Sequence, residues 1–215
     1  MELVRIDTQR AYELIREKIT SLELAPGSPI DEGKLADEME MGQVPVREAL
    51  NLLAHDHLVT TADQGLFVSK VEIPDLQQIS DIRILLEPYC AAQAAIHATS
   101  DDIVVLEALS KEQSQIPPDQ PKQLFDLDHK FHQAIARAAK NKYLAEILED
   151  FYGHSRRVWF LVLPHLDFLS TAVESHLDMV QAIKNQNGDQ AAQIMQEHVQ
   201  GFYAKVFEIL NKTSE

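Results

Sequence analysis

The chain has 215 residues, of which 45% are hydrophobic, and it carries a formal net charge of −15. This composition favours a folded protein with a small and a medium-sized domain, and it excludes bulk disorder. A single cysteine, Cys90, excludes an internal disulfide and is typical of a reducing compartment, so we expect a cytoplasmic protein. The N-terminus lacks a signal peptide's apolar core and no apolar run approaches a membrane span, so we expect no membrane partner.

The first seventy residues predict three helices and a β-hairpin. Residues 8–22 carry apolar side chains at helical spacing, with Asp7 or Thr8 as the predicted N-cap. After the Pro26-Gly27 break, short helices are predicted over residues 31–40 and 44–55. Two strand-like runs, residues 58–61 and 66–70, flank a turn that contains Gly65. This order is typical of a winged helix-turn-helix, which we assign to residues 1–71.

Residues 72–215 predict an all-helical domain. Six helices are expected, over residues 75–99, 101–115, 122–139, 142–163, 168–186 and 189–211, with Pro164 and Asn187-Gly188-Asp189 among the separators. In the second separator, Gly188 is the predicted C′ residue of one helix and Asp189 the predicted N-cap of the next. The predicted fold class is therefore mainly α: a winged helix-turn-helix followed by a six-helix effector-binding bundle.

Four ionisable residues of the helical domain lie on or beside apolar helix faces. Asp128 and His132 are one turn apart along the flank of an apolar stripe, whereas His129 points nearly opposite. His176 and His198 fall on the inner faces of two later helices. One carboxylate and three imidazoles are ligands that suit a divalent metal such as zinc, nickel or manganese. The alternative for each histidine alone is a core residue with a hydrogen-bond partner.

The N-terminal residues also carry a resemblance. The run PVREAL at residues 45–50, the Leu35-Ala36 pair and the wing glycine resemble the winged-helix domain of the GntR family of transcription regulators, over nearly all of residues 8–70. The resemblance implies that DNA is contacted by Gln43, Val44, Pro45, Arg47, Gln64 and Gly65.

Two departures from the family pattern bear on DNA binding. The family usually has Ser-Arg-Thr where this chain has Gly42-Gln43-Val44, and it often has an arginine where this chain has Gln64. Fewer cations weaken phosphate binding, although glutamine can read adenine. Residues 1–70 also carry seven Lys and Arg against thirteen Asp and Glu, which opposes DNA binding. The alternative to an altered operator preference is therefore a degenerate winged helix that binds DNA weakly.

The helical part resembles the FCD effector domain of the FadR branch of the same family. The segments IRILLEPYCAAQAA, FDLDHKFHQAIARAAKN and ESHLDMVQAIKNQNGDQAAQIMQEHV carry the resemblance, which covers most of residues 75–205. In that branch an Asp-x-x-x-His pair and two later histidines bind a metal, and they map onto Asp128, His132, His176 and His198. The branch usually keeps an arginine near its cavity, at the position of Arg83. An ion pair of Arg83 with Asp81 or Glu87 is the alternative.

The resemblance implies a homodimeric regulator rather than an enzyme. A small carboxylate, bound at the metal and by Arg83 or Arg156, would change the affinity for a pseudo-palindromic double-stranded DNA operator. One alternative is a metal- or metabolite-binding protein whose winged helix is degenerate. A second is an all-α metal-dependent hydrolase. The hydrolase leaves the winged helix unexplained, and no spare base is directed at the metal.

Overall fold

The computed structural model describes residues 2–117, 120–162 and 169–213. The chain divides into two compact units, Met1–Glu72 and Ile73–Glu215, each of which has its own buried apolar core. In the described ranges, no helix is both long and apolar enough to cross a membrane. Pro164, predicted to separate two helices, lies outside the described residues.

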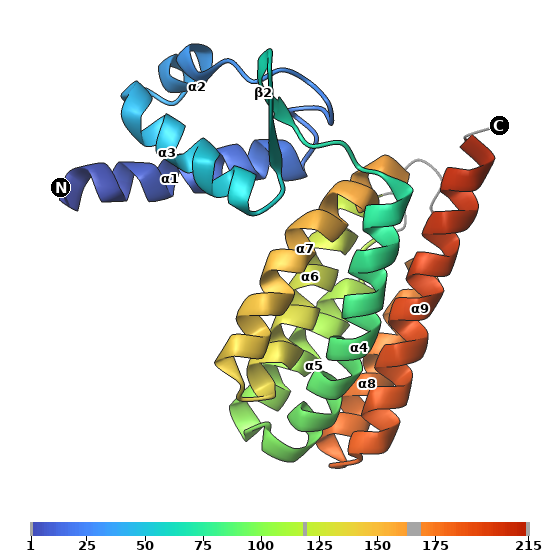
Figure 1. Cartoon of the computed structure of the whole chain (residues 1–215). Coiled ribbons are helices and arrows are strands. Elements are labelled where there is room, and N and C mark those ends of the chain that lie inside the picture. The colour runs from blue at the N-terminus through green and yellow to red at the C-terminus, as the bar shows by residue number, and fades with distance from the viewer. Residues whose placement is uncertain (1, 118–119, 163–168, 214–215) are drawn as a thin grey trace. The chain divides into compact units, whose positions relative to one another are not determined.

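The first unit contains three helices and a two-stranded wing (Figure 1). They are α1 (Glu2–Thr20), α2 (Glu32–Glu38), α3 (Gln43–His55), β1 (Val59–Ala62) and β2 (Gly65–Val68). The strands are antiparallel, with Val59 opposite Val68 and Ala62 opposite Gly65. Gly65 has a φ of 123°, which a residue with a side chain rarely adopts, so the wing turn requires glycine here. The predicted winged helix-turn-helix layout is confirmed.

Packing between α1 and α3 holds the first unit together. The members of the buried apolar core on these two helices are Ala11, Ile15 and Ile19 on α1 and Val46, Ala49, Leu50 and Leu53 on α3. The short helix α2 is fixed at its start by Asp31, whose carboxylate accepts the backbone N–H of Lys34 at 3.0 Å. An N-cap of this kind satisfies a backbone donor that the helix itself leaves without a partner.

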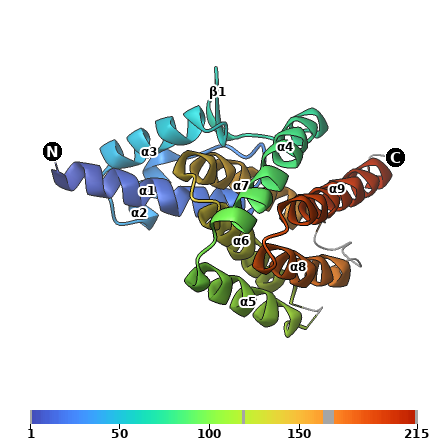
Figure 2. The same ribbon diagram turned by 90° about the horizontal axis from the view of Figure 1, so that it is seen from below.

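In the residues that the structure describes, the second unit is a bundle of six helices, as predicted. They are α4 (Ile73–His97), α5 (Ser100–Ser114), α6 (Pro121–Ala138), α7 (Lys142–Val162), α8 (Leu169–Lys184) and α9 (Gly188–Thr213). Figures 1 and 2 show the long helices α4 and α9 side by side, and α4 also packs against α6 and α7. The apolar core lies between these helices and includes Phe131, Ile135, Met179, Ile183 and Val199.

Two predicted helix ends are wrong. The first helix begins at Glu2, so neither Asp7 nor Thr8 is its N-cap; Thr8 instead donates its hydroxyl to Glu48 at 2.8 Å. At the turn before α9, the residue with positive φ is Gln186, at 57°, rather than Gly188. Asn187 accepts the backbone N–H of Gln190 at 3.1 Å and thereby caps α9. Gly188 is already helical, and a Cβ there would lie 3.3 Å from the carbonyl oxygen of Ala92.

Candidate metal centre

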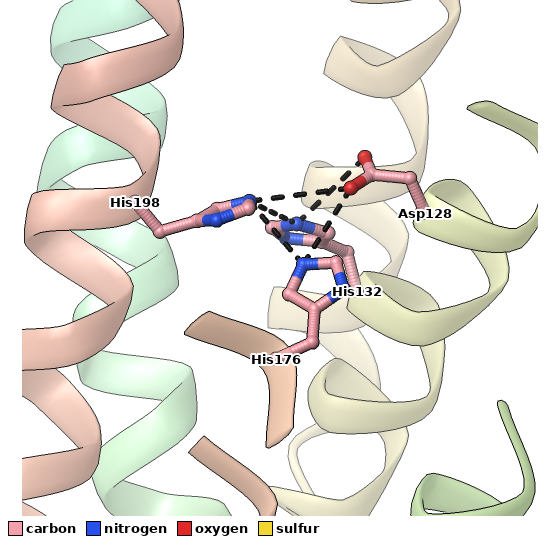
Figure 3. A group of neighbouring side chains, drawn as sticks. All are labelled: Asp128, His132, His176 and His198. Atoms are coloured by element: carbon pink, nitrogen blue, oxygen red, sulfur yellow. Dashed lines mark hydrogen bonds and ion pairs between the residues drawn. The ribbon is translucent and has the colours of Figure 1, made fainter. Parts of the chain in front are cut away.

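Three helices bring the four predicted ligands together (Figure 3). Asp128 and His132 lie one turn apart on the same side of α6. This side adjoins the buried apolar residues of the helix, so both side chains face the interior of the bundle. His176 comes from α8 and His198 from α9, and both imidazoles point toward the α6 pair. All four side chains are at least nine-tenths buried.

The donor atoms of these side chains converge on one point. The Nε2 atom of His198 lies 3.2 Å from that of His132 and 3.3 Å from that of His176. Asp128 presents Oδ1 at 3.5 Å from Nε2 of His176 and 4.0 Å from Nε2 of His198. One donor atom from each residue lies within 4.8 Å of all the others. The four side chains therefore surround a single small volume.

Partners on the outer side of the imidazole rings fix which nitrogen faces inward. Nδ1 of His132 donates to Oε2 of Glu87 at 2.6 Å, and Nδ1 of His176 donates to Oε1 of Gln113 at 2.6 Å. The Gln113 amide nitrogen donates to the carbonyl of Leu124, which turns its oxygen toward His176. In the neutral rings, both inward Nε2 atoms then carry lone pairs.

The remaining two ligands are held in the same way. Nδ1 of His198 lies 2.8 Å from the hydroxyl of Ser175, and Tyr152 donates its hydroxyl to Oδ2 of Asp128 at 2.7 Å. Oδ1 of Asp128 is thus the oxygen nearer to His176 and His198. Such partners orient metal ligands and contribute to metal affinity.

Burial keeps two of the imidazoles neutral. It lowers the pKa of His198 to about 4, with His132 acting in the same direction. Burial, together with His198 and His132, also lowers the pKa of His176 well below its ordinary value. A neutral imidazole offers the lone pair that a metal ligand needs, so these rings can bind a cation at neutral pH.

The donor set fits a divalent metal ion. Metal–nitrogen bonds of about 2.1 Å place neighbouring ligand atoms about 3.0–3.4 Å apart in octahedral or tetrahedral sites. The observed Nε2–Nε2 separations of 3.2 and 3.3 Å fall in that range. The lone pairs of His132 and His176 both face Nε2 of His198, which carries at most one proton. A cation would satisfy all of these lone pairs at once.

A cavity of about 410 Å³ opens beside Asp128 and His198. Arg83 and Lys205 contribute cations to its wall, and Asp178 and Glu197 contribute carboxylates, whereas Trp159 and Phe202 add a stacked aromatic wall. This volume is within the range of small-molecule sites. Arg83 also forms an ion pair with Glu87, so the two predicted alternatives, a position at the cavity and an ion pair, both hold for this arginine.

The structure separates the other polar candidates from this cavity. Arg156, predicted to bind the effector, lies 4.0 Å from Asp126 and is not among the described residues that line the cavity. Its neighbour Arg157 is buried, and burial lowers its pKa to about 10 although Asp75 acts in the opposite direction. His129 stacks on Tyr152 and contacts Glu149 at 3.0 Å, and it is not part of the cluster of four predicted ligands.

The predicted DNA-contacting residues of the first unit differ in their exposure. Gln43, Val44 and Arg47 are exposed at the start of α3, and Gln64 and Gly65 are exposed at the wing turn. Pro45 is buried, so its side chain is not presented at the surface and instead fixes the first turn of α3. Nε of Arg47 donates to Glu32 at 2.9 Å.

Sequence reasoning missed the residues that hold the ligands, namely Glu87, Gln113, Tyr152 and Ser175. Glu87 entered only as an alternative partner of Arg83. Its one available signal is its spacing of four residues from Arg83 on an otherwise apolar helix segment. The others carry no such signal, because their partners lie 23 to 63 residues away in the chain.

Comparison with known protein families gives a match for each of the two units. Residues 7–68 match the family of bacterial regulatory proteins called the gntR family, and residues 78–201 match the FCD domain. The chain belongs to the GntR family of regulators that carry an FCD domain. Both matches lie within the units that the fold defines.

Relatives of this GntR-family chain are transcription regulators. It is 27% identical over 209 residues to the HTH-type transcriptional repressor RspR of Escherichia coli K12, covering 96% of this chain and 92% of that one. It is also 27% identical over 191 residues to the Nta operon transcriptional regulator of Aminobacter aminovorans, covering 88% and 90%. The structure of Escherichia coli McbR/YncC shares the fold, with a TM-score of 0.84 at 22% identity over 95% and 98% of the two chains. The family and these relatives are regulators, not enzymes.

Proposed function

We propose that the protein is a metabolite-responsive repressor or activator in which a divalent metal anchors a small carboxylate effector in the helical unit. The observation that carries the proposal is the convergence of Asp128, His132, His176 and His198, with every ligand held by a further side chain. The three-nitrogen, one-oxygen set suits zinc, nickel or manganese. When bound, the metal would supply a Lewis-acidic centre with coordination positions left for an anionic oxygen.

The cavity beside the ligands supports a carboxylate as the effector. Arg83 offers a guanidinium whose Nη1 also reaches the hydroxyls of Ser155 at 3.2 Å and Tyr203 at 3.4 Å, so its position is fixed. Lys205 is a second cation at the cavity wall, but it pairs with Glu208 at 3.0 Å, and Asp178 and Glu197 line the same cavity, so Arg83 and the metal are the groups proposed to bind the effector. A planar guanidinium binds carboxylates through paired hydrogen bonds. Arg156 is not part of this proposal, because it is not among the described residues that line the cavity.

An exposed apolar surface supports a homodimer. Leu85, Tyr89 and Ile96 are 73%, 53% and 62% exposed and follow one side of α4. Tyr143 of α7 is 66% exposed and lines the same groove as Tyr89. Apolar patches of this kind are typical of protein–protein interfaces. Sedimentation of a Leu85→Glu variant tests this surface: the expected result is a monomer, and an unchanged dimer would exclude the surface.

For DNA recognition, we propose Gln43, Val44 and Arg47 at the start of α3, with Gln64 and Gly65 in the wing. In a dimer, the two winged helices would bind the two halves of a pseudo-palindromic operator. The second candidate function is metabolite binding without DNA binding, and the pairing of Arg47 with Glu32 favours it because it neutralises a recognition-helix cation. Fluorescence anisotropy with DNA from upstream of the protein's own gene decides between them. Absence of sequence-preferring binding at low salt, with and without carboxylates, would exclude the regulator.

Metal analysis tests the site directly. The purified protein is expected to contain about one divalent ion per chain, and the double variant His176→Ala, His198→Ala is expected to lose it. His97→Ala is the matched control, because it removes an exposed histidine at the end of α4, outside the cluster. Retention of the ion in the double variant, or its loss in the control, would place the ligands elsewhere.

A further inference from the structure

The carboxylate of Glu87 is buried between a metal-ligand candidate and a cavity arginine. Its Oε2 accepts from Nδ1 of His132 at 2.6 Å, and its Oε1 accepts from Nε of Arg83. Only 3% of the residue is exposed. The guanidinium of Arg83 is always charged, and its ion pair with this carboxylate holds the carboxylate in the ionised form.

An ionised carboxylate accepts hydrogen bonds and donates none. Nδ1 of His132 must therefore carry the proton of the neutral ring, which leaves the lone pair on Nε2. Nε2 is the nitrogen that faces His198, 3.2 Å away. The tautomer that binds a metal is thus selected by a residue outside the ligand set.

We propose that Glu87 is the positioning residue that keeps His132 in its metal-binding tautomer, and that Arg83 holds Glu87 in place. The proposal rests on the metal site proposed above. It joins that site to the cavity through a closed series of contacts. Arg83 lies 4.8 Å from the centre of the Tyr152 ring, and Tyr152 donates to Asp128, so both ligands of α6 are linked to this arginine.

This series of contacts implies that the binding of an anion in the cavity and the binding of the metal affect each other's affinity. An effector anion that engages Arg83 shares this guanidinium with Glu87, and Glu87 in turn fixes His132. A carboxylate bound in the cavity thereby changes the affinity for metal through α4, even without touching the metal itself. Binding linkage makes this effect reciprocal.

The substitution Glu87→Gln removes the negative charge of the side chain but keeps its size and shape. The side-chain amide has one accepting and one donating end, and the cationic Arg83 attracts the oxygen. The amide nitrogen then faces Nδ1 of His132 and forces the proton onto Nε2. The inward nitrogen loses its lone pair, although the volume of the side chain is unchanged.

Nitrogen NMR of the histidine rings tests the tautomer in metal-free protein, at a pH where the rings are neutral. The expected result is a protonated Nδ1 for His132 in the wild type and a protonated Nε2 in Glu87→Gln. The same tautomer in both proteins would overturn the proposal. Because no metal is present, this result does not depend on whether the proposed metal site is correct.

Zinc affinity, measured by competition with a chromophoric chelator, gives the second readout. Glu87→Gln is expected to bind zinc about 10–100-fold more weakly than the wild type. Asp81→Asn is the matched control, because it removes an exposed carboxylate from the same helix and is expected to leave zinc binding unchanged. Equal affinities for the wild type and Glu87→Gln would overturn the proposal, whereas failure of the wild type to bind zinc would overturn the metal site itself.

A double variant distinguishes positioning from general damage. In Arg83→Met, Glu87→Gln no cation attracts the amide oxygen, so it is free to accept from Nδ1 of His132. Zinc binding is expected to be tighter than in Glu87→Gln, because the metal-binding tautomer returns. The double variant also leaves no unpaired charge at the position of the Arg83–Glu87 pair, so it remains informative if the single variant fails to fold. Zinc binding as weak as in the single variant, or weaker, would overturn the proposal.

Discussion

Acidifying the metal-free protein is expected to unfold it in a pH range set by the buried histidines. The pKa of His198 is about 4 in the fold, against an ordinary value of 6.5. Because the folded value is the lower one, the unfolded chain takes up the proton first. The contribution of His198 to the free energy of unfolding is therefore complete above pH 6.5 and is lost as the pH falls toward 4. At about 1.4 kcal/mol per pKa unit, the loss is about 3 kcal/mol.

Urea denaturation of chelator-treated protein at several pH values between 7.5 and 4.5 measures this loss. In His198→Gln the decrease between these limits is expected to be smaller than in the wild type by about 2.5 kcal/mol. His97→Gln is the control, because His97 is exposed at the end of α4 and outside the cluster. If the wild type and His198→Gln lose stability in parallel, the imidazole of His198 is not held neutral by burial, and the reasoning about the site fails.

Three further predictions concern other parts of the chain. Arg47→Ala is expected to weaken operator binding and to reduce the slope of log affinity against log salt by about one, measured by anisotropy; an unchanged slope would show that Arg47 stays with Glu32 instead of contacting phosphate. Asn187→Ala removes the cap of α9 and is expected to lower the free energy of unfolding by about 1 kcal/mol in urea titrations, without altering metal content; a loss below the error of the titration would contradict the capping role. Zinc at a hundred times its dissociation constant is expected to stabilise the fold by about 2.7 kcal/mol, and a melting temperature indifferent to zinc would argue against a native-state site.

The metal-site candidates could be predicted because each depends on helical phase within one segment. Asp128 and His132 share a flank of α6, and inward positions on α8 and α9 follow from neighbouring apolar residues. The surrounding partners could not be predicted, since each of them depends on how two helices are placed in space. Glu87 meets His132 only because α4 packs against α6.

The turn before α9 shows the same limit at a smaller scale. Asn187, Gly188 and Asp189 each suit a helix end, and the sequence alone favours glycine as the residue after the preceding helix. The fold instead uses glycine for close approach, because the backbone of Ala92 on α4 leaves no comfortable room for a Cβ at Gly188. Gln186 then takes the left-handed conformation and Asn187 the cap.

A second glycine, Gly201, lies in the middle of α9 on the wall of the cavity beside the metal ligands. A Cβ at this position would meet no protein atom within 4 Å, so packing of the chain does not require glycine there. Glycine inside a helix costs about 1 kcal/mol relative to alanine. The space in the cavity can therefore be reduced one methyl group at a time at Gly201, with no repacking and with a gain in helix stability. A substitution at Gly201 would therefore change the size of molecule that the cavity admits without changing the residues that would bind that molecule.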